Sequence, residues 1–215
     1  MNGCGCIYEK YVKRFLDITI SLVALLLFSW LYLLLAALVL LFHGKPVIYS
    51  AVRVGKNEKP FKLYKFRSMT NACDAEGNLL PGKDRLTKFG RLLRASSLDE
   101  LPEIYNILKG EMSIVGPRPL PEAYLPYYTE EERPRHNVRP GLTGLAQANG
   151  RNAISWDKKF EYDVSYVQNV SLLLDLKILL KTVVKVLKRD GIGQGEKMPM
   201  SLHLERQDRK QKVGK

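Results

Sequence analysis

Residues 18–42 form an uncharged run, ITISLVALLLFSWLYLLLAALVLLF. It holds 25 consecutive residues without a charge, and about 20 such residues in a helix cross the hydrocarbon core of a bilayer. A core helix of a soluble protein rarely runs this far without a polar face. A cleaved signal peptide would have a shorter apolar run, of about 7–15 residues, followed by small residues. The run therefore predicts a segment that inserts into a membrane, within an N-terminal unit of residues 1–44.

Basic residues flank the run on both sides, and they decide how it can sit in the membrane. They are Lys10, Lys13 and Arg14 before it, and Lys45, Arg53, Lys56 and Lys59 after it. Because basic residues prefer the cytoplasmic side, a re-entrant hairpin suits both clusters better than a straight span. Ser29 lies near the midpoint and can bond back to a carbonyl one turn earlier, which bends a helix, whereas the adjacent Trp30 is no helix breaker. The residues alone leave hairpin and span open.

The composition of the chain excludes several classes of protein and indicates which kinds of molecule it binds. Its 215 residues carry 34 Lys and Arg against 22 Asp and Glu, a net charge of +12, and 46% are hydrophobic, which excludes wholesale disorder. Three cysteines exclude a disulfide scaffold, and Cys4 and Cys6 lie too close together for an unstrained bridge, which favours a reducing, cytosol-facing setting. No zinc site is expected, because no C-x-x-C motif accompanies a histidine cluster. The positive charge favours anionic lipid or a phosphorylated substrate, and no nucleic-acid-binding motif accompanies it.

Residues 45–190 have the composition of a basic globular domain with short elements. Strands are predicted at residues 47–54 and 61–69, an exposed polar loop at 71–83, and a helix with regularly spaced basic residues at 85–94. The apolar residues of 172–187, with lysines along one side, predict an amphipathic helix that lies at the membrane interface or packs on the core. The polar residues 191–215 predict a flexible tail. The fold class expected is an irregular α/β: a membrane hairpin, short strands and interfacial helices.

An acid pair follows the basic helix, in Ser97-Leu98-Asp99-Glu100. One interpretation is structural: Ser97 with Glu100 three residues later matches a capping box at a helix start. The other is chemical: a carboxylate there can attack a phosphorus atom while its neighbour holds Mg²⁺. Arg118, in a proline-bracketed turn, and a glycine-rich loop at residues 139–151 could then contact phosphate through guanidinium and backbone N–H groups.

Several motifs together resemble those of the bacterial sugar transferase family. They are SLDELP at residues 97–102, MSIVGPRP at 112–119, RPGLTGLAQ at 139–147, NGRN at 149–152 and WDKKFEYD at 156–163. Members of this family are monotopic phosphoglycosyl transferases that act on polyprenyl phosphate. The short chain looks most like the minimal members, the diacetylbacillosamine-1-phosphate transferases.

The resemblance implies a two-step reaction at the cytoplasmic face of the bacterial inner membrane. Asp99 would attack the β-phosphorus of a UDP-sugar and release UMP, and polyprenyl (undecaprenyl) phosphate would then accept the phosphosugar. Glu100 matches the family's Mg²⁺-binding carboxylate. Basic residues around the phosphates are matched by Arg94, Arg118 and Arg151, with Lys65 as a further candidate.

The chain departs from the family pattern at two positions. The family breaks its re-entrant helix at a Ser-Pro pair, and here Ser29 is followed by Trp30. Glu103 stands where glutamine is common, and a third acid close to the pair can raise the pKa of a carboxylate. A different class of function, a membrane-anchored scaffold that binds anionic lipid, would fit the charge but gives no role to acids placed between arginine loops.

Overall fold

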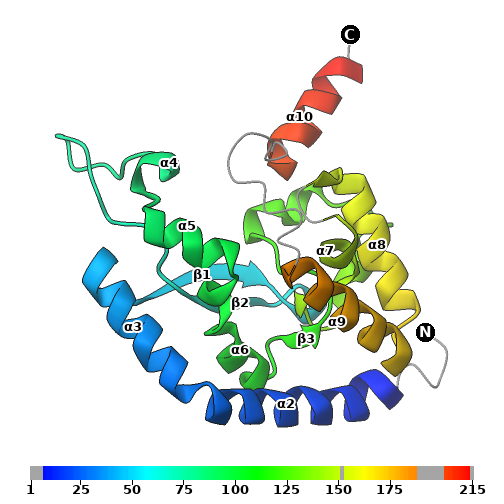
Figure 1. The fold of residues 1–215 in the computed structure, drawn as a ribbon. Helices are drawn as coiled ribbons and strands as arrows, with labels where there is room; N and C mark the ends of the chain where they lie inside the picture. The colour runs from blue at the N-terminus through cyan, green and yellow to red at the C-terminus, as the bar shows by residue number, and fades with distance from the viewer. Residues whose placement is uncertain (1–6, 151–152, 188–200, 214–215) are drawn as a thin grey trace.

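The computed structural model describes residues 7–150, 153–187 and 201–213, so Cys4, Cys6 and Arg151 lie outside the described residues (Figure 1). A bent arm of two helices, α2 (Lys13–Leu27) and α3 (Ser29–His43), runs along one edge of the molecule. The rest of the domain lies inside the bend of this arm (Figure 1). The apolar N-terminal segment therefore packs along part of its length against the domain.

The arm bends at the midpoint of the apolar run. The segments Tyr8–Leu27 and Ser29–His43 meet at 67°, and the backbone of Phe28 between them leaves helical geometry. The Ser29 hydroxyl donates to the carbonyl oxygen of Leu26 at 3.1 Å, as the sequence predicted for a bend at Ser29. Among the described residues no one helix has the length and apolarity to cross a bilayer, whereas this bent pair has both when taken together.

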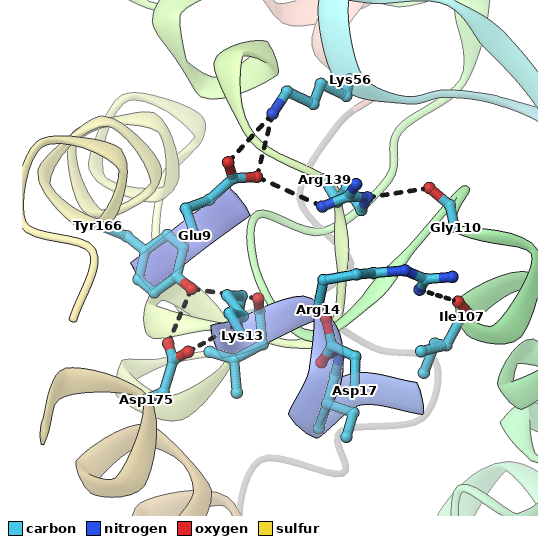
Figure 2. Close-up of polar contacts among 12 residues, drawn as sticks. Glu9, Lys13, Arg14, Asp17, Lys56, Ile107, Gly110, Arg139, Tyr166 and Asp175 are labelled. Carbon is cyan, nitrogen blue, oxygen red and sulfur yellow. Dashed lines mark hydrogen bonds and ion pairs between the residues drawn. The ribbon is translucent and has the colours of Figure 1, made fainter. Parts of the chain in front are cut away.

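One face of the arm is apolar and exposed, and the opposite face is tied to the domain by polar contacts (Figure 2). Lys13 Nζ lies 2.6 Å from Asp175 Oδ2, which also accepts a hydrogen bond from Tyr8. Arg14 donates to the carbonyls of Ile107 and Leu108 at 2.6 and 2.8 Å. Buried charges are stable only with such partners, so these contacts fix the arm against the domain.

The strand β1 (Ile48–Val54) pairs antiparallel with β2 (Pro60–Phe66), and the short helix η2 (Lys56–Glu58) joins them. The first strand was predicted within one residue. The second ends at Phe66, earlier than the predicted Met69, because its partner begins opposite at Ile48. The polar loop predicted at residues 71–83 is exposed over residues 71–79, as predicted, but its last two residues already belong to a helix that begins at Gly82.

A second, parallel pair consists of β3 (Ser113–Val115) and β4 (Gly141–Thr143). Helices α7 (Leu145–Asn149), α8 (Trp156–Gln168) and α9 (Leu172–Leu187) follow, and the segments η4 (Glu122–Tyr127) and η5 (Arg133–Asn137) precede β4. Val115, Tyr166 and Ile178 are buried in the cluster that joins β3 to α8 and α9. The exposed surface of α9 carries leucines and valines together with Lys177 and Lys181, which agrees with the predicted amphipathic helix.

The predicted basic helix at residues 85–94 is wrong as a single element. Two helices occupy this region, α4 (Gly82–Arg85) and α5 (Lys88–Ala95), because Thr87 starts a new helix by accepting a hydrogen bond from Gly90 N. Arg85 therefore does not share a helix face with Arg91 and Arg94. A β-carbon on Gly90 would lie 1.9 Å from the carbonyl oxygen of Ser68, so glycine lets α5 pack closely on the end of β2.

The prediction of a flexible tail is wrong for part of the C-terminal segment. Residues Leu202–Val213 form helix α10, whose Leu202 is fully buried beside Tyr128, Trp156 and Phe160. Arg206 pairs with both Glu132 and Asp157. Composition is a poor guide here because a few contacts, made by Leu202, Arg206 and the ring of His203, attach a helix that is mostly polar. Residues 191–200 of the predicted tail lie outside the described part of the chain.

Candidate active site

The acid pair lies in a tight turn between two helices. After α5, Ser97 adopts a left-handed conformation (φ 58°), and Leu98–Glu100 form the short 3-10 helix η3, which we call the catalytic turn. The helix α6 (Glu103–Lys109) begins only after Pro102. The capping-box interpretation is wrong, because the Ser97 side chain makes no capping hydrogen bond and Glu100 precedes the helix. The two acids are therefore free of a capping role.

Glu100 is held in its charged form by two cations. Its Oε1 lies 2.6 Å from Lys65 Nζ and 2.8 Å from Arg118 Nη2. Burial by itself would raise the pKa of Glu100, but Arg118 and Lys65 outweigh burial and lower the pKa to about 2. Lys65 comes from β2 and Arg118 from the turn after β3, so residues far apart in sequence meet at this carboxylate.

Asp99 is the buried member of the pair, with 8% of its surface exposed. Burial raises its pKa, the neighbouring charge of Glu100 raises it further, and Lys65, Arg94 and Arg118 oppose both effects. Desolvation makes a carboxylate a stronger nucleophile than it is in water, and the surrounding cations suit a site where phosphate charge is to be bound. Three of the predicted phosphate-binding residues, Lys65, Arg94 and Arg118, thus interact electrostatically with Asp99.

Arg94 is oriented by a residue that sequence reasoning missed. Its Nε donates to the hydroxyl of Ser68 at 2.8 Å, and Ser68 is itself buried at the end of β2. A signal existed in the sequence, since Ser68 follows Lys65 just past the alternating strand. The structure brings together Lys65, Arg94, Asp99, Glu100 and Arg118, while Arg151 lies outside the described residues.

The N–H group of Gly141, in the glycine-rich loop at residues 139–151, is bound within the protein. Gly116 N donates to Thr143 O, and Gly141 N donates to Pro117 O, at 2.8 and 2.9 Å. A β-carbon on Gly141 would lie 2.1 Å from Gly116 N, so these glycines permit two chain segments to pack together. Their role is to fix the turn that carries Arg118. The carbonyl oxygen of Arg118 is bound in turn by the buried Arg135 at 2.7 Å.

Three carboxylates of the described chain, those of Asp99, Glu100 and Glu103, lie along this segment. The described residues include no cluster of three or more His, Cys, Asp or Glu side chains arranged to hold a metal ion by themselves. Mg²⁺ does not need one, because it is usually bound through one or two carboxylates together with substrate phosphates and water. The carboxylate oxygens of the catalytic turn are donors of the type that Mg²⁺ takes in such sites.

Glu103 is a third acid in the site, and its ionisation weakens the fold. It is 2% exposed and lies 3.0 Å from Lys65 Nζ. Burial, with a contribution from Glu100, raises its pKa to about 7 against the attraction of Lys65. The pKa in the unfolded chain is about 4.3. The folded protein therefore binds the proton more tightly, and stability is lost as the pH rises from about 4 to about 7.

Glu103→Gln is expected to remove this loss. The variant should unfold at nearly the wild-type temperature at pH 4 and at a higher temperature than the wild type at pH 8, because glutamine resembles the protonated acid. Thermal unfolding of the purified full chain at both pH values measures the effect. Glu122→Gln, at an exposed position of η4, serves as the control. A difference between variant and wild type that stays the same at both pH values would contradict the expectation.

Known sugar transferases resemble this chain over most of its length. The family model described as bacterial sugar transferase matches residues 8–189. The chain is 56% identical over 183 residues to the uncharacterized sugar transferase EpsL of Bacillus subtilis, covering 85% of this chain and 91% of that protein. It is 42% identical over 191 residues to the exopolysaccharide production protein ExoY of Rhizobium meliloti, covering 81% and 84%.

A longer relative is matched over part of its length. The chain is 40% identical over 195 residues to the UDP-glucose:undecaprenyl-phosphate glucose-1-phosphate transferase of Klebsiella pneumoniae, covering 86% of this chain but 41% of that protein. The family match spans the arm, the catalytic turn and all the cations gathered around it. The chain therefore belongs to the bacterial sugar transferase family.

Proposed function

We propose that the protein transfers a sugar phosphate from a UDP-sugar to undecaprenyl phosphate and releases UMP. The observation that carries the proposal is the buried Asp99 beside the charged Glu100, surrounded by Lys65, Arg94 and Arg118. Relatives named for transferring glucose-1-phosphate or galactose phosphate to undecaprenyl phosphate support the same class of reaction. A phosphoglycosyl transferase is thus favoured over a lipid-binding scaffold.

The reaction proceeds in two displacements at one phosphorus atom. In the first, a carboxylate oxygen of Asp99 bonds to the β-phosphorus of the UDP-sugar, and the bond from that phosphorus to the bridging oxygen breaks, so that UMP leaves. In the second, a phosphate oxygen of the lipid bonds to the same phosphorus, and the bond to Asp99 breaks. Arg94, Arg118 and Lys65 stabilise the negative charge that builds up on the phosphoryl oxygens. Arg151 is proposed to join them.

Glu100 is the residue proposed to hold Mg²⁺. The ion would neutralise charge on the phosphates of the donor, which is its usual contribution to phosphoryl transfer. Lys65 and Arg118 bind Glu100 in the structure and keep it ionised, so the carboxylate is ready to act as a ligand.

We propose further that the bent arm enters and leaves the membrane on one side. The 67° bend at Phe28, the basic residues on both flanks and the exposed apolar face of the arm support this geometry. Exposed Leu26, Leu27 and Trp30 lie at the bend, where insertion would be deepest. The globular domain would then lie on the cytoplasmic face of the inner membrane, with the apolar side of α9 at the interface.

The proposal is tested with the purified full chain in nanodiscs. We expect UMP release when a UDP-sugar, undecaprenyl phosphate and Mg²⁺ are all present, and a loss of at least about 100-fold when Mg²⁺ is chelated. A panel of UDP-glucose, UDP-galactose, their N-acetyl derivatives and UDP-diacetylbacillosamine identifies the donor. Binding of undecaprenyl phosphate without UMP release from any donor would favour the scaffold instead.

A further inference from the structure

The second helix of the arm packs directly beneath the catalytic turn. Leu35 and Val39 of α3 are buried with Phe66 and Leu93, and the side chains of Leu98 and Leu101 pack against the same cluster. Leu98 and Leu101 bracket Asp99 in the sequence. The apolar segment predicted to be embedded in lipid therefore also supports the backbone that carries the proposed nucleophile.

Tyr32 of α3 adds a polar contact to this packing. Its hydroxyl donates to the carbonyl oxygen of Leu101 at 2.5 Å, two residues after Asp99. Its ring lies 6.0 Å from the ring of Phe66, the neighbour of Lys65. Burial raises the pKa of Tyr32 to about 12, so the hydroxyl keeps its proton and remains a donor at physiological pH. One side chain thus touches both segments that meet at Glu100.

The catalytic turn has little hydrogen bonding of its own to hold it. Glu100 N and Leu101 N donate to Ser97 O and Leu98 O at 3.2 and 3.3 Å, which is long for N–H···O bonds. Ser97 is in the left-handed region, which is unfavourable for a residue with a side chain. Tyr32 adds a contact from outside the turn at the Leu101 carbonyl, which also accepts a hydrogen bond from Ile104 N at 3.1 Å.

We propose that Tyr32 is a positioning residue, which holds Asp99 in line with the donor phosphate by fixing the carbonyl of Leu101. This inference rests on the proposed function. The bend of the arm is what delivers the side chain, because Phe28 lies one helical turn before Tyr32 and a straight helix would continue away from the domain. The arm is then part of the catalytic machinery as well as an anchor.

The test is Tyr32→Phe in the full chain, which removes the hydroxyl and keeps the ring. We expect kcat for UMP release to fall about tenfold, because small errors in the placement of a nucleophile slow the reaction strongly. KM for the UDP-sugar and for undecaprenyl phosphate should stay within about twofold, since the proposed action of Tyr32 is on the Leu101 carbonyl and not on a substrate. The unfolding temperature should fall by no more than about 4 °C, as for the loss of one hydrogen bond.

Tyr105→Phe is the matched control. This tyrosine of α6 is 55% exposed, and its ring contacts that of Tyr64 in β2. An unchanged kcat in Tyr32→Phe would overturn the proposal. A lower kcat accompanied by a higher KM or by a larger drop in unfolding temperature would show general loosening and would also overturn it. The wild type, measured in the same assay, separates this result from a failure of the proposed function, which would leave every variant without UMP release.

Discussion

Asp99→Asn is expected to lower the rate of UMP release by about 10⁴-fold or more. Asparagine has nearly the same size as aspartate but no carboxylate oxygen that can bond to phosphorus, and loss of a nucleophile in a covalent mechanism has effects of this order. The folded protein should not be weakened. The raised pKa of Asp99 means that its charged form is unfavourable in the fold, so the neutral side chain should leave the unfolding temperature at neutral pH equal or higher.

Three measurements check this expectation on one preparation: UMP release, thermal unfolding, and mass spectrometry of the protein quenched in the presence of the UDP-sugar and Mg²⁺ but without undecaprenyl phosphate. The wild type should gain the mass of one sugar phosphate, and Asp99→Asn should gain none. Asp84→Asn, at an exposed position of α4, is the matched control and should behave as the wild type. Turnover by Asp99→Asn at the wild-type rate would eliminate the covalent mechanism.

Glu100→Gln is expected to lower the rate of UMP release by about 10² to 10³-fold. It removes the proposed ligand of Mg²⁺ and the negative charge that binds Lys65 and Arg118. The Mg²⁺ concentration that gives half-maximal activity should rise at least about tenfold. Stability should fall as well. A pKa lowered to about 2 contributes stability that is present above the unfolded value of about 4.3, so glutamine loses it at neutral pH.

Metal titrations of UMP release, with Glu122→Gln as the exposed control, measure the effect on Mg²⁺. The rate is expressed per folded enzyme, so that the lower stability of Glu100→Gln does not enter. An unchanged Mg²⁺ dependence in this variant would show that Glu100 is no metal ligand, even if the rate were low.

Local patterns in the sequence predicted the elements whose geometry depends on neighbours along the chain. The strand at residues 47–54, the amphipathic helix at 172–187 and the bend at Ser29 follow from alternation, spacing and a side chain that bonds one turn back. The acid pair was found because its surrounding motifs resemble those of a family. In each case the decisive contacts lie within a few residues or within a motif.

Predictions failed where distant segments decide the outcome. The glycines at 116 and 141 accommodate each other across the parallel strand pair, which cannot be read from either loop alone. The sequence around Ser97 predicts an N-terminal helix cap. In the structure Ser97 instead lies in a left-handed turn after α5, from which Leu98 and Leu101 pack against the cluster that includes residues of α3. Leu202 attaches a polar helix to an aromatic cluster whose members lie at least 42 positions earlier.

The ion pair between Lys13 and Asp175 also has a consequence for how the chain is made. Its two members are separated by 162 positions, and a ribosome that adds roughly 5–20 residues per second needs roughly 8–30 s to cover that distance. The apolar run at residues 18–42 is therefore synthesised before Asp175, so the buried contact that fixes the first helix of the arm to α9 can form only after residues 14–174 have been made. Until then the acids near Lys13 along the chain include Asp17, which interacts with it electrostatically in the folded protein.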